Sequence, residues 1–449
     1  MSAESTTTLQ DDQHKARYLA DLARVAPNSA PAWLRQMRAE ALTQFRGAAL
    51  PHTRIEEWRQ TNIAPIIETP YESVLEPAPH GLRRADIAPL LYNEEGWTEL
   101  VFVDGHFDEA LSSRGPLPEG AHAGGLREAW HGAEAKIIRP HLGKYLQERN
   151  AYTALNSAFL LDGAFVHLPK NAAPGKPVHL LFLMSRHDHP AAAHPRSLIV
   201  LEPGSEAQVL VTFAAMDGGA DYLNNAVEEI VLGNNARLTY VRVVEEQVQG
   251  HLLATTEVHQ GRDSRMYSFA ATLSGQIVRN QICVELAEEN GESVVDGLYL
   301  NDGKRLVDNM LSVHHSQPQG TSRISCRGIL DGESKSVFLG KVCVHPNAQK
   351  TDSRQLNKNL LLSDHASVET KPQLEIYADD VKCTHGATVG APPQEVLFYF
   401  RSRGISEEAA RGMLTCGFAG EVIEEIPIEA VRARLHRYVF EKYAPAKVR

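Results

Sequence analysis

Two short segments of the chain each carry a thiol and an imidazole two residues apart. In "DDVKCTHGATVG" these are Cys383 and His385, and in "VFLGKVCVH" they are Cys343 and His345. A thiolate and a neutral imidazole are ligands that zinc and iron accept. Two ligands leave half of a tetrahedral site open, so a metal at Cys383 and His385 would need another subunit or inorganic sulfide to complete it. A Cys–His catalytic pair and a strand without a chemical role are the alternatives.

The alternation of side chains along a strand assigns each thiol to a face. Cys326 shares a face with Ile324 and Leu330, which predicts a thiol in the core. Cys283 falls opposite the apolar residues of "NQICVEL" and is expected to face outward. The chain has five cysteines, and the odd number favours free thiols.

The two Cys-x-His segments are both expected to face outward. Cys343 and His345 lie on the polar face of their strand, and no role is assigned to this pair. The alternation of "QLEIYADDVKCTHG" also places Cys383 and His385 outward, unless a turn at 379–380 resets it. The sequence therefore does not decide which face of the strand carries Cys383 and His385.

Two other polar patterns are interpreted structurally. Adjacent histidines, His314 and His315, are more often a surface pair than a pair of ligands. Gln355, Asn357 and Asn359 alternate along "QLNKN" and predict a ladder of solvated side chains or a recognition surface, of which the ladder is preferred.

Composition and missing motifs narrow the class of protein. The 449 residues contain 45 Lys+Arg and 56 Asp+Glu, a net charge of −11, which argues against nucleic acid or an anionic membrane as a partner. No apolar window reaches the ~20 residues that span a bilayer, and the first residues lack a secretory signal, so a cytoplasmic location is expected. The sequence lacks the P-loop motif GxxxxGK[ST] for nucleotide hydrolysis, the GxSxG motif of serine hydrolases and the HExxH motif of zinc proteases. It also lacks the CxxC spacing of common zinc and iron–sulfur sites.

The elements that must position these residues fall into three regions. Residues 1–160 are expected to form a mainly helical domain that includes a hairpin at Asp104–Gly105, and residues 392–449 a second helical domain. Between them, residues 161–391 have the short strands and polar turns of a β domain. The C-terminal helices could cap this domain or dock a partner, and the cap is favoured.

Turns in the middle region recur at a nearly constant interval. Their gaps are 30, 28, 29, 29 and 27 residues, measured at Gly204, Asn234, Arg262, Gly291, Gly320 and Asn347. Such a repeat is the pattern of stacked coils that bury one continuous core. The sequence therefore predicts a mainly β fold, a parallel β-helix flanked by helical domains.

Several segments resemble the SufB/SufD family of iron–sulfur cluster assembly proteins. The most specific are "TDSRQLNKNLLLSDHASVETKPQLEIYADDVKCTHGATVG" and "LFYFRSRGI", and "CTHGATVG" with "SRGI" is similar to the SufD branch. "RIEEWRQTNI" and "ALNSAFLLDGAFVHLPKN" extend the resemblance toward the start of the chain. The resemblance implies a right-handed parallel β-helix.

The resemblance also implies a function and partners. The chain would be a non-catalytic scaffold subunit that forms a complex with SufB and with the SufC ATPase, which would bind the C-terminal helices. His385, and less securely Cys383, would contribute ligands to a transient iron–sulfur cluster or iron at the interface with SufB. Binding of a flavin by the assembled complex and homodimerisation of the isolated chain are left open.

Two other functions compete with this interpretation. One is a polysaccharide-active β-helix enzyme, against which the lack of a secretory signal and of an acidic metal cluster counts. The other is a purely structural subunit that supports the complex without contact to the cluster.

Overall fold

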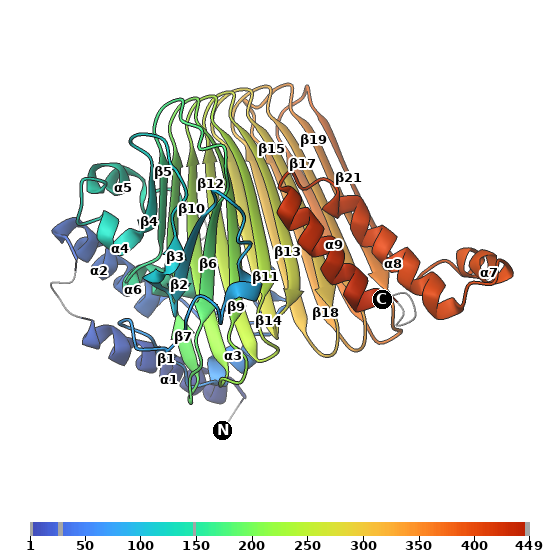
Figure 1. Cartoon of the computed structure of the whole chain (residues 1–449), viewed down its shortest axis with the longest axis horizontal. Helices are drawn as coiled ribbons and strands as arrows, with labels where there is room; N and C mark the ends of the chain where they lie inside the picture. Colours follow the sequence, from blue (N-terminus) through green and yellow to red (C-terminus); the bar gives the residue numbers. More distant parts are fainter. Residues whose placement is uncertain (1–2, 26–29, 147–149, 445–449) are drawn as a thin grey trace.

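The centre of the molecule is a parallel β-solenoid of about eight turns (Figure 1). It is seen in a computed structural model that describes residues 3–25, 30–146 and 150–444. Each turn contributes one strand to each of two sheets, and neighbouring strands of a sheet are parallel. The predicted class, a mainly β protein with a parallel solenoid and helices before and after it, is confirmed.

The first sheet runs through every second strand of the solenoid. Its strands are β5 (Ala164–Leu168), β8 (Arg196–Leu201), β10 (Tyr222–Leu232), β12 (Gly250–Gln260), β14 (Ile277–Leu286), β16 (Leu306–His315), β18 (Lys335–Val344) and β20 (Ser367–Ile376). The short strands β4 (His122–Gly125), β7 (Ala191–Ala193) and β1 (Glu72–Ser73) join it near its N-terminal end. The last strand, β20, pairs on one side only.

The second sheet holds the alternate strands. They are β6 (Val178–Met184), β9 (Glu206–Ala215), β11 (Arg237–Glu245), β13 (Arg265–Ser274), β15 (Glu292–Asn301), β17 (Thr321–Leu330), β19 (Asp352–Leu361) and β21 (Lys382–Gly390). The antiparallel hairpin β2 (Thr98–Val103) and β3 (His106–Ser113), which turns at Asp104–Gly105 as predicted, extends this sheet beyond β6.

One corner of the solenoid repeats the same backbone turn. A residue with positive φ recurs there once per turn, at Gly204, Asn235, Asp263, Asn290, Gln319 and Lys350. The left-handed region favours Gly, Asn and Asp, so the first four are suited to it. These residues fall within three positions of the turns counted in the sequence, which confirms the predicted period.

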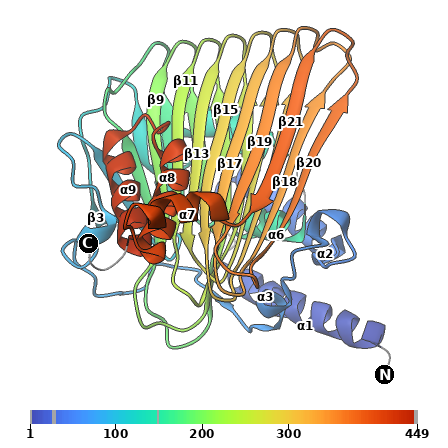
Figure 2. The same ribbon diagram turned by 90° about the vertical axis from the view of Figure 1, so that its right-hand side faces the viewer.

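The two ends of the solenoid are covered differently. At the N-terminal end the core continues into Phe102 of β2, and the segment that contains Phe107, Leu117 and Ala121 packs against it. Inside this end Phe182 stacks between Phe102 and Phe213, at ring distances of 4.7 and 5.1 Å. At the other end β20 and β21 are the last strands, and no element of the described part of the chain pairs with their outer edges (Figure 2). We call these the closed end and the open end.

N-terminal helices cover the outer face of the first sheet. They are α1 (Ala3–Arg24), α2 (Ala32–Gly47), α3 (Ala64–Glu68), α4 (Leu126–Ala129), α5 (Ala135–His141) and α6 (Ala151–Phe159), with short 3₁₀ turns at Glu56–Trp58 and Ala88–Leu90. Part of "RIEEWRQTNI" crosses this face: Trp58 lies 3.8 Å from the Arg279 guanidinium, and Thr61 donates a 2.6 Å hydrogen bond to Asp308. Buried Arg279 and Asp308 also form an ion pair.

The C-terminal helices pack on the outer face of the second sheet. They are α8 (Glu407–Ile423), which Ser406 caps through the amide of Ala409, and α9 (Glu429–Tyr443). The preceding helix, α7 (Gln394–Ser402), contacts α8 and projects away from the sheet (Figure 1). Val431, Leu435 and Val439 of α9 are buried as predicted, against sheet residues such as Phe269. The expectation that these helices cap the solenoid is wrong, because the apolar outer face of the sheet, and not its end, takes their apolar side chains.

Within the part of the chain that the structure describes, we find no helix both long and apolar enough to span a membrane.

Candidate functional site

Cys383 and His385 lie on the last strand of the second sheet. β21 pairs with β19 alone, with Cys383 opposite Ser353 and His385 opposite Gln355. The strand is therefore an edge of the sheet, and no strand among residues 3–25, 30–146 and 150–444 pairs with the backbone groups on its other side. The pair sits at the open end of the solenoid.

Both side chains are on the inward face of the strand, so the outward alternative is wrong. Val381 and Cys383 pack against the solenoid core, and Ser353, the partner of Cys383, is buried. The chain bends at 379–380, where the Lys350 amide donates a 2.7 Å hydrogen bond to the Asp380 carbonyl. This turn resets the alternation that β20 establishes.

Their inward direction does not bury them, because no further turn lies above β21. Cys383 is half-buried and His385 is exposed. Burial raises the pKa of the Cys383 thiol, and the nearby carboxylate of Asp352 raises it further. His385 therefore offers an open imidazole, beside a thiol that favours its protonated form until a positive charge or a metal approaches.

The interior just below this pair is polar. Gln355, Asn357 and Asn359 of β19 are buried, and Asn357 donates a 3.1 Å hydrogen bond to the Tyr299 hydroxyl. The expected solvated ladder is therefore wrong: these side chains share one face, but that face points into the solenoid. The amide group of Gln355, opposite His385, has no hydrogen-bond partner among the residues that the structure describes.

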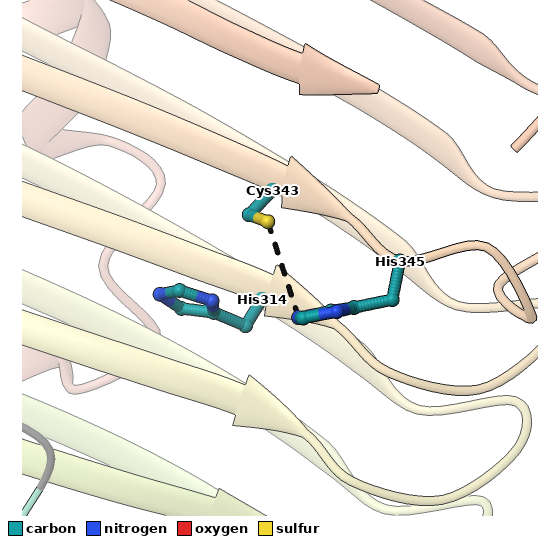
Figure 3. A group of neighbouring side chains, drawn as sticks. All are labelled: His314, Cys343 and His345. Carbon is teal, nitrogen blue, oxygen red and sulfur yellow. Dashed lines mark hydrogen bonds between the residues drawn. The ribbon is translucent and has the colours of Figure 1, made fainter. Parts of the chain in front are cut away.

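The other pair, Cys343 and His345, lies at the end of β18 in the first sheet, on the outer face of that sheet (Figure 3). Phe338, Val342 and Val344 of β18 point into the core, so Cys343 points outward as predicted. The Cys343 sulfur is 3.9 Å from Nε2 of His345. His314 of β16 is directly opposite Cys343, and ligand atoms of all three residues lie within 4.8 Å of one another.

The histidine beside His314 has a different environment. His315 is fully buried, where its Nε2 is 2.8 Å from the Ser322 hydroxyl. The expected surface pair is therefore wrong, because adjacent residues on a strand face opposite sides and the inner side is the core. His314 faces outward and is half-buried.

The structure also shows on which side of their strands Cys326 and Cys283 lie. Cys326 belongs to the core, as predicted, and burial raises its pKa. Cys283 does lie opposite Ile282 and Val284, which are in the core, but it is buried as well. The predicted outward direction is therefore confirmed, although the outer face of the sheet is covered enough at this position to bury the thiol.

The association of His314 with Cys343 was missed, although the sequence contained a signal for it. The two residues are 343 − 314 = 29 positions apart, which is one period of the solenoid. Residues one period apart become neighbours on adjacent turns. Comparing polar residues at the repeat distance would have brought the group together.

The fold and the donors together define a class of protein: a parallel solenoid whose last turn is uncovered and carries an exposed imidazole and a half-buried thiol. Two family models match the chain, the SufBD protein N-terminal region over residues 10–180 and the SufBD core domain of SUF-system FeS cluster assembly over residues 182–418. The chain therefore belongs to the SufBD family of iron–sulfur cluster assembly proteins.

Named relatives agree with this assignment. An iron–sulfur cluster assembly SufBD family protein of Synechocystis is 31% identical over 90% of this chain and 89% of its own length. The iron–sulfur cluster assembly protein SufD of Escherichia coli is 29% identical, covering 88% and 89%. SufD of Bacillus subtilis is 25% identical, covering 90% and 93%.

Proposed function

We propose that this chain is the scaffold subunit that pairs with a SufB-type subunit in an iron–sulfur cluster assembly complex, and that it supplies His385 to a nascent cluster at their interface. The observation that carries the proposal is the position of His385, an exposed imidazole that faces into the uncovered end of the solenoid. Cys383 is the second, weaker candidate ligand. The division into domains of residues 1–160, 161–391 and 392–449 also remains a proposal.

The exposure of the last turn supports an interface at the open end. Ile376 of β20 is 41% exposed, whereas Val344, its neighbour one turn earlier, is fully buried. Val389 of β21 is 46% exposed, and its neighbour Asn359 only 4%. Positions that are buried in the earlier turns are thus exposed to water in the last one. A second protein that covered them would be stabilised by burying their apolar surface.

The strands at this end add a second argument. β20 and β21 contain ten and nine residues, and each has a neighbour on one side only. Long uncovered edge strands invite pairing with another chain. A partner placed there would bring its own side chains close to His385. A second copy of this chain could cover the same end in the isolated protein.

The number of donors favours a shared site. Among the residues that the structure describes, His314, Cys343 and His345 are the one group of three or more potential ligands close to one another, so Cys383 and His385 do not belong to a complete set of donors. An iron or a cluster held there would take its remaining ligands from sulfide and from the partner. A purely structural subunit would not require an accessible imidazole at this place.

The C-terminal helices are the proposed docking site of a SufC-type ATPase. Phe398 and Tyr399 of α7 are 72% and 57% exposed, and Met413 of α8 is 53% exposed. Exposed aromatic and Met side chains are enriched at protein interfaces. The nucleotide chemistry would then belong to the partner.

The experiment is to co-express the chain with SufB-type and SufC-type partners and to replace His385 by Ala. We expect the complex to form at normal yield, because His385 is exposed, and its iron and sulfide content to fall several-fold. Thr384→Ala is the matched control, since Thr384 is exposed on the opposite face of the same strand. Unchanged cluster content in H385A would overturn the ligand role and favour a purely structural subunit.

A further inference from the structure

Stacking of the solenoid turns places a third potential ligand, His314, beside Cys343 and His345. His314 and Cys343 occupy equivalent positions on β16 and β18, adjacent strands of the first sheet. His345 follows two residues after Cys343, and its amide donates a 3.0 Å hydrogen bond to the His315 carbonyl. This bond continues the ladder beyond the end of β18 and fixes the backbone from which the His345 ring extends.

The three side chains lie close to the separation that a metal ion requires. With metal–sulfur bonds of about 2.3 Å and metal–nitrogen bonds of about 2.0 Å, ligand atoms in a tetrahedral site are roughly 3.3–3.6 Å apart. The Cys343 sulfur and His345 Nε2 are separated by 3.9 Å, and all ligand atoms lie within 4.8 Å of one another. Shifts of about 1 Å, within reach of side-chain rotation, would close the group around an ion.

The arrangement of the rings is compatible with such closure. The His345 ring reaches back toward the Cys343 sulfur, and the His314 ring lies beyond it on the neighbouring strand (Figure 3). The two imidazole rings are 6.1 Å apart, with an angle of 32° between their planes. No backbone element needs to move for the three donors to meet.

The surroundings favour a cation and leave one position accessible. Cys343 is 6% exposed and His314 is half-buried, whereas His345 is exposed. Glu285 and Glu375 lie in the same row across the sheet, opposite His314 and Cys343 respectively, and Glu375 forms an ion pair with Lys341 at 2.9 Å. Glu285 offsets part of the charge of a bound ion, and solvent can supply a fourth ligand.

We propose that His314, Cys343 and His345 form a binding site for one divalent transition-metal ion, such as Zn²⁺ or Fe²⁺, on the outer face of the first sheet. One thiolate and two imidazoles are ligands for such borderline and soft ions and not for Mg²⁺ or Ca²⁺. The site is distinct from the proposed cluster site, because Cys383 and His385 lie on the inward face of the other sheet. The inference does not depend on the role of His385.

The test uses Co²⁺ as a spectroscopic probe of the full-length, reduced and chelator-treated chain under anaerobic conditions. We expect about one equivalent of Co²⁺ to produce sulfur-to-metal charge-transfer absorption together with the visible bands of a tetrahedral complex. Cys343→Ser is expected to abolish the charge-transfer absorption. Loss of one imidazole in His345→Ala or His314→Ala is expected to weaken Co²⁺ binding at least tenfold.

The variants are chosen so that loss of folding cannot imitate loss of the site. His345 is exposed, so H345A should retain the thermal unfolding midpoint of the parent. A Cys383→Ser/His385→Ala chain is the matched control, because it lacks the other Cys-x-His pair and should bind Co²⁺ as the parent does. Absence of charge-transfer bands in the parent, their persistence in C343S, or normal affinity in H345A would each overturn the proposal.

Discussion

The closed and the open end of the solenoid contain the same kind of turn but expose it differently. At the closed end the stacked rings of Phe102, Phe182 and Phe213 fill the interior beneath the β2–β3 hairpin. At the open end Leu374 is half-buried and His385 is exposed. A repeat buries a residue only if another layer lies above it, so the uncovered turn is where this chain can offer donors to another protein.

Two histidines, one near each end of the solenoid, differ in how accessible their imidazole rings are. His194 lies in the first turns of the solenoid, near the closed end and beneath the N-terminal helices. Its ring stacks 4.4 Å from Phe159 of α6, and the side-chain amide of Asn225 donates a 3.2 Å hydrogen bond to its Nδ1. Burial lowers the pKa of His194 to about 3. A neutral, hydrogen-bonded and enclosed imidazole serves the structure, whereas the exposed His385 is free to bind.

The largest expected effect concerns packing. Phe213→Ala removes a fully buried ring at the closed end and should lower the free energy of unfolding by about 3–5 kcal/mol. Leu374→Ala at the open end should cost about 1 kcal/mol in the isolated chain, because part of the side chain is already in water. Urea unfolding of both variants measures the difference. Equal losses would contradict the distinction between the two ends.

A smaller effect concerns pH, and it should arise near the closed end. His194 has an ordinary pKa of 6.5 when unfolded and about 3 when folded, so the unfolded chain binds a proton first as the pH falls. Its contribution to stability is complete above pH 6.5 and is lost toward pH 3, by about 1.4 kcal/mol per pH unit. His194→Asn should therefore reduce the slope of urea stability against pH between 6.5 and 4.5 by about 1.4 kcal/mol per pH unit. Buried His14, His251 and His315, whose pKa values burial also lowers, keep the rest of the slope.

The parent and F213A provide the comparison for this measurement. Phe213 does not titrate, so F213A should lower stability by a similar amount at every pH and leave the slope of the parent unchanged. A slope in the His194→Asn variant equal to that of the parent would show that His194 does not carry the acid sensitivity assigned to it.

The fold could largely be predicted from the sequence because the solenoid repeats one local rule. A turn near Gly204 recurs as a turn near Asn235 and again near Asp263, and each turn places the same alternation on the same faces. The burial of Cys326 followed from two apolar neighbours on its own strand. Local patterns of this kind remain valid because adjacent turns impose the same environment.

The site was harder to predict because it depends on what covers each turn. The faces of Gln355 and His385 depended on which side of the strand is interior, and the bend at 379–380 resets the alternation between β20 and β21. The burial of Cys283 could not be predicted either, because the alternation along a strand gives the direction of a side chain and not what covers it. The pairing of His314 with Cys343 becomes visible only when polar residues one repeat apart, here 29 positions, are compared with one another.

The central claim is that His385 acts because it faces into the uncovered end of the solenoid. The most direct test is the double variant Thr384→His/His385→Thr, which keeps the composition and moves the imidazole to the outer face of β21. Both positions are exposed, so the variant should fold and assemble with the SufB-type and SufC-type partners. We predict that its iron and sulfide content falls to the level of H385A. Cluster content equal to that of the unmodified complex would contradict the account.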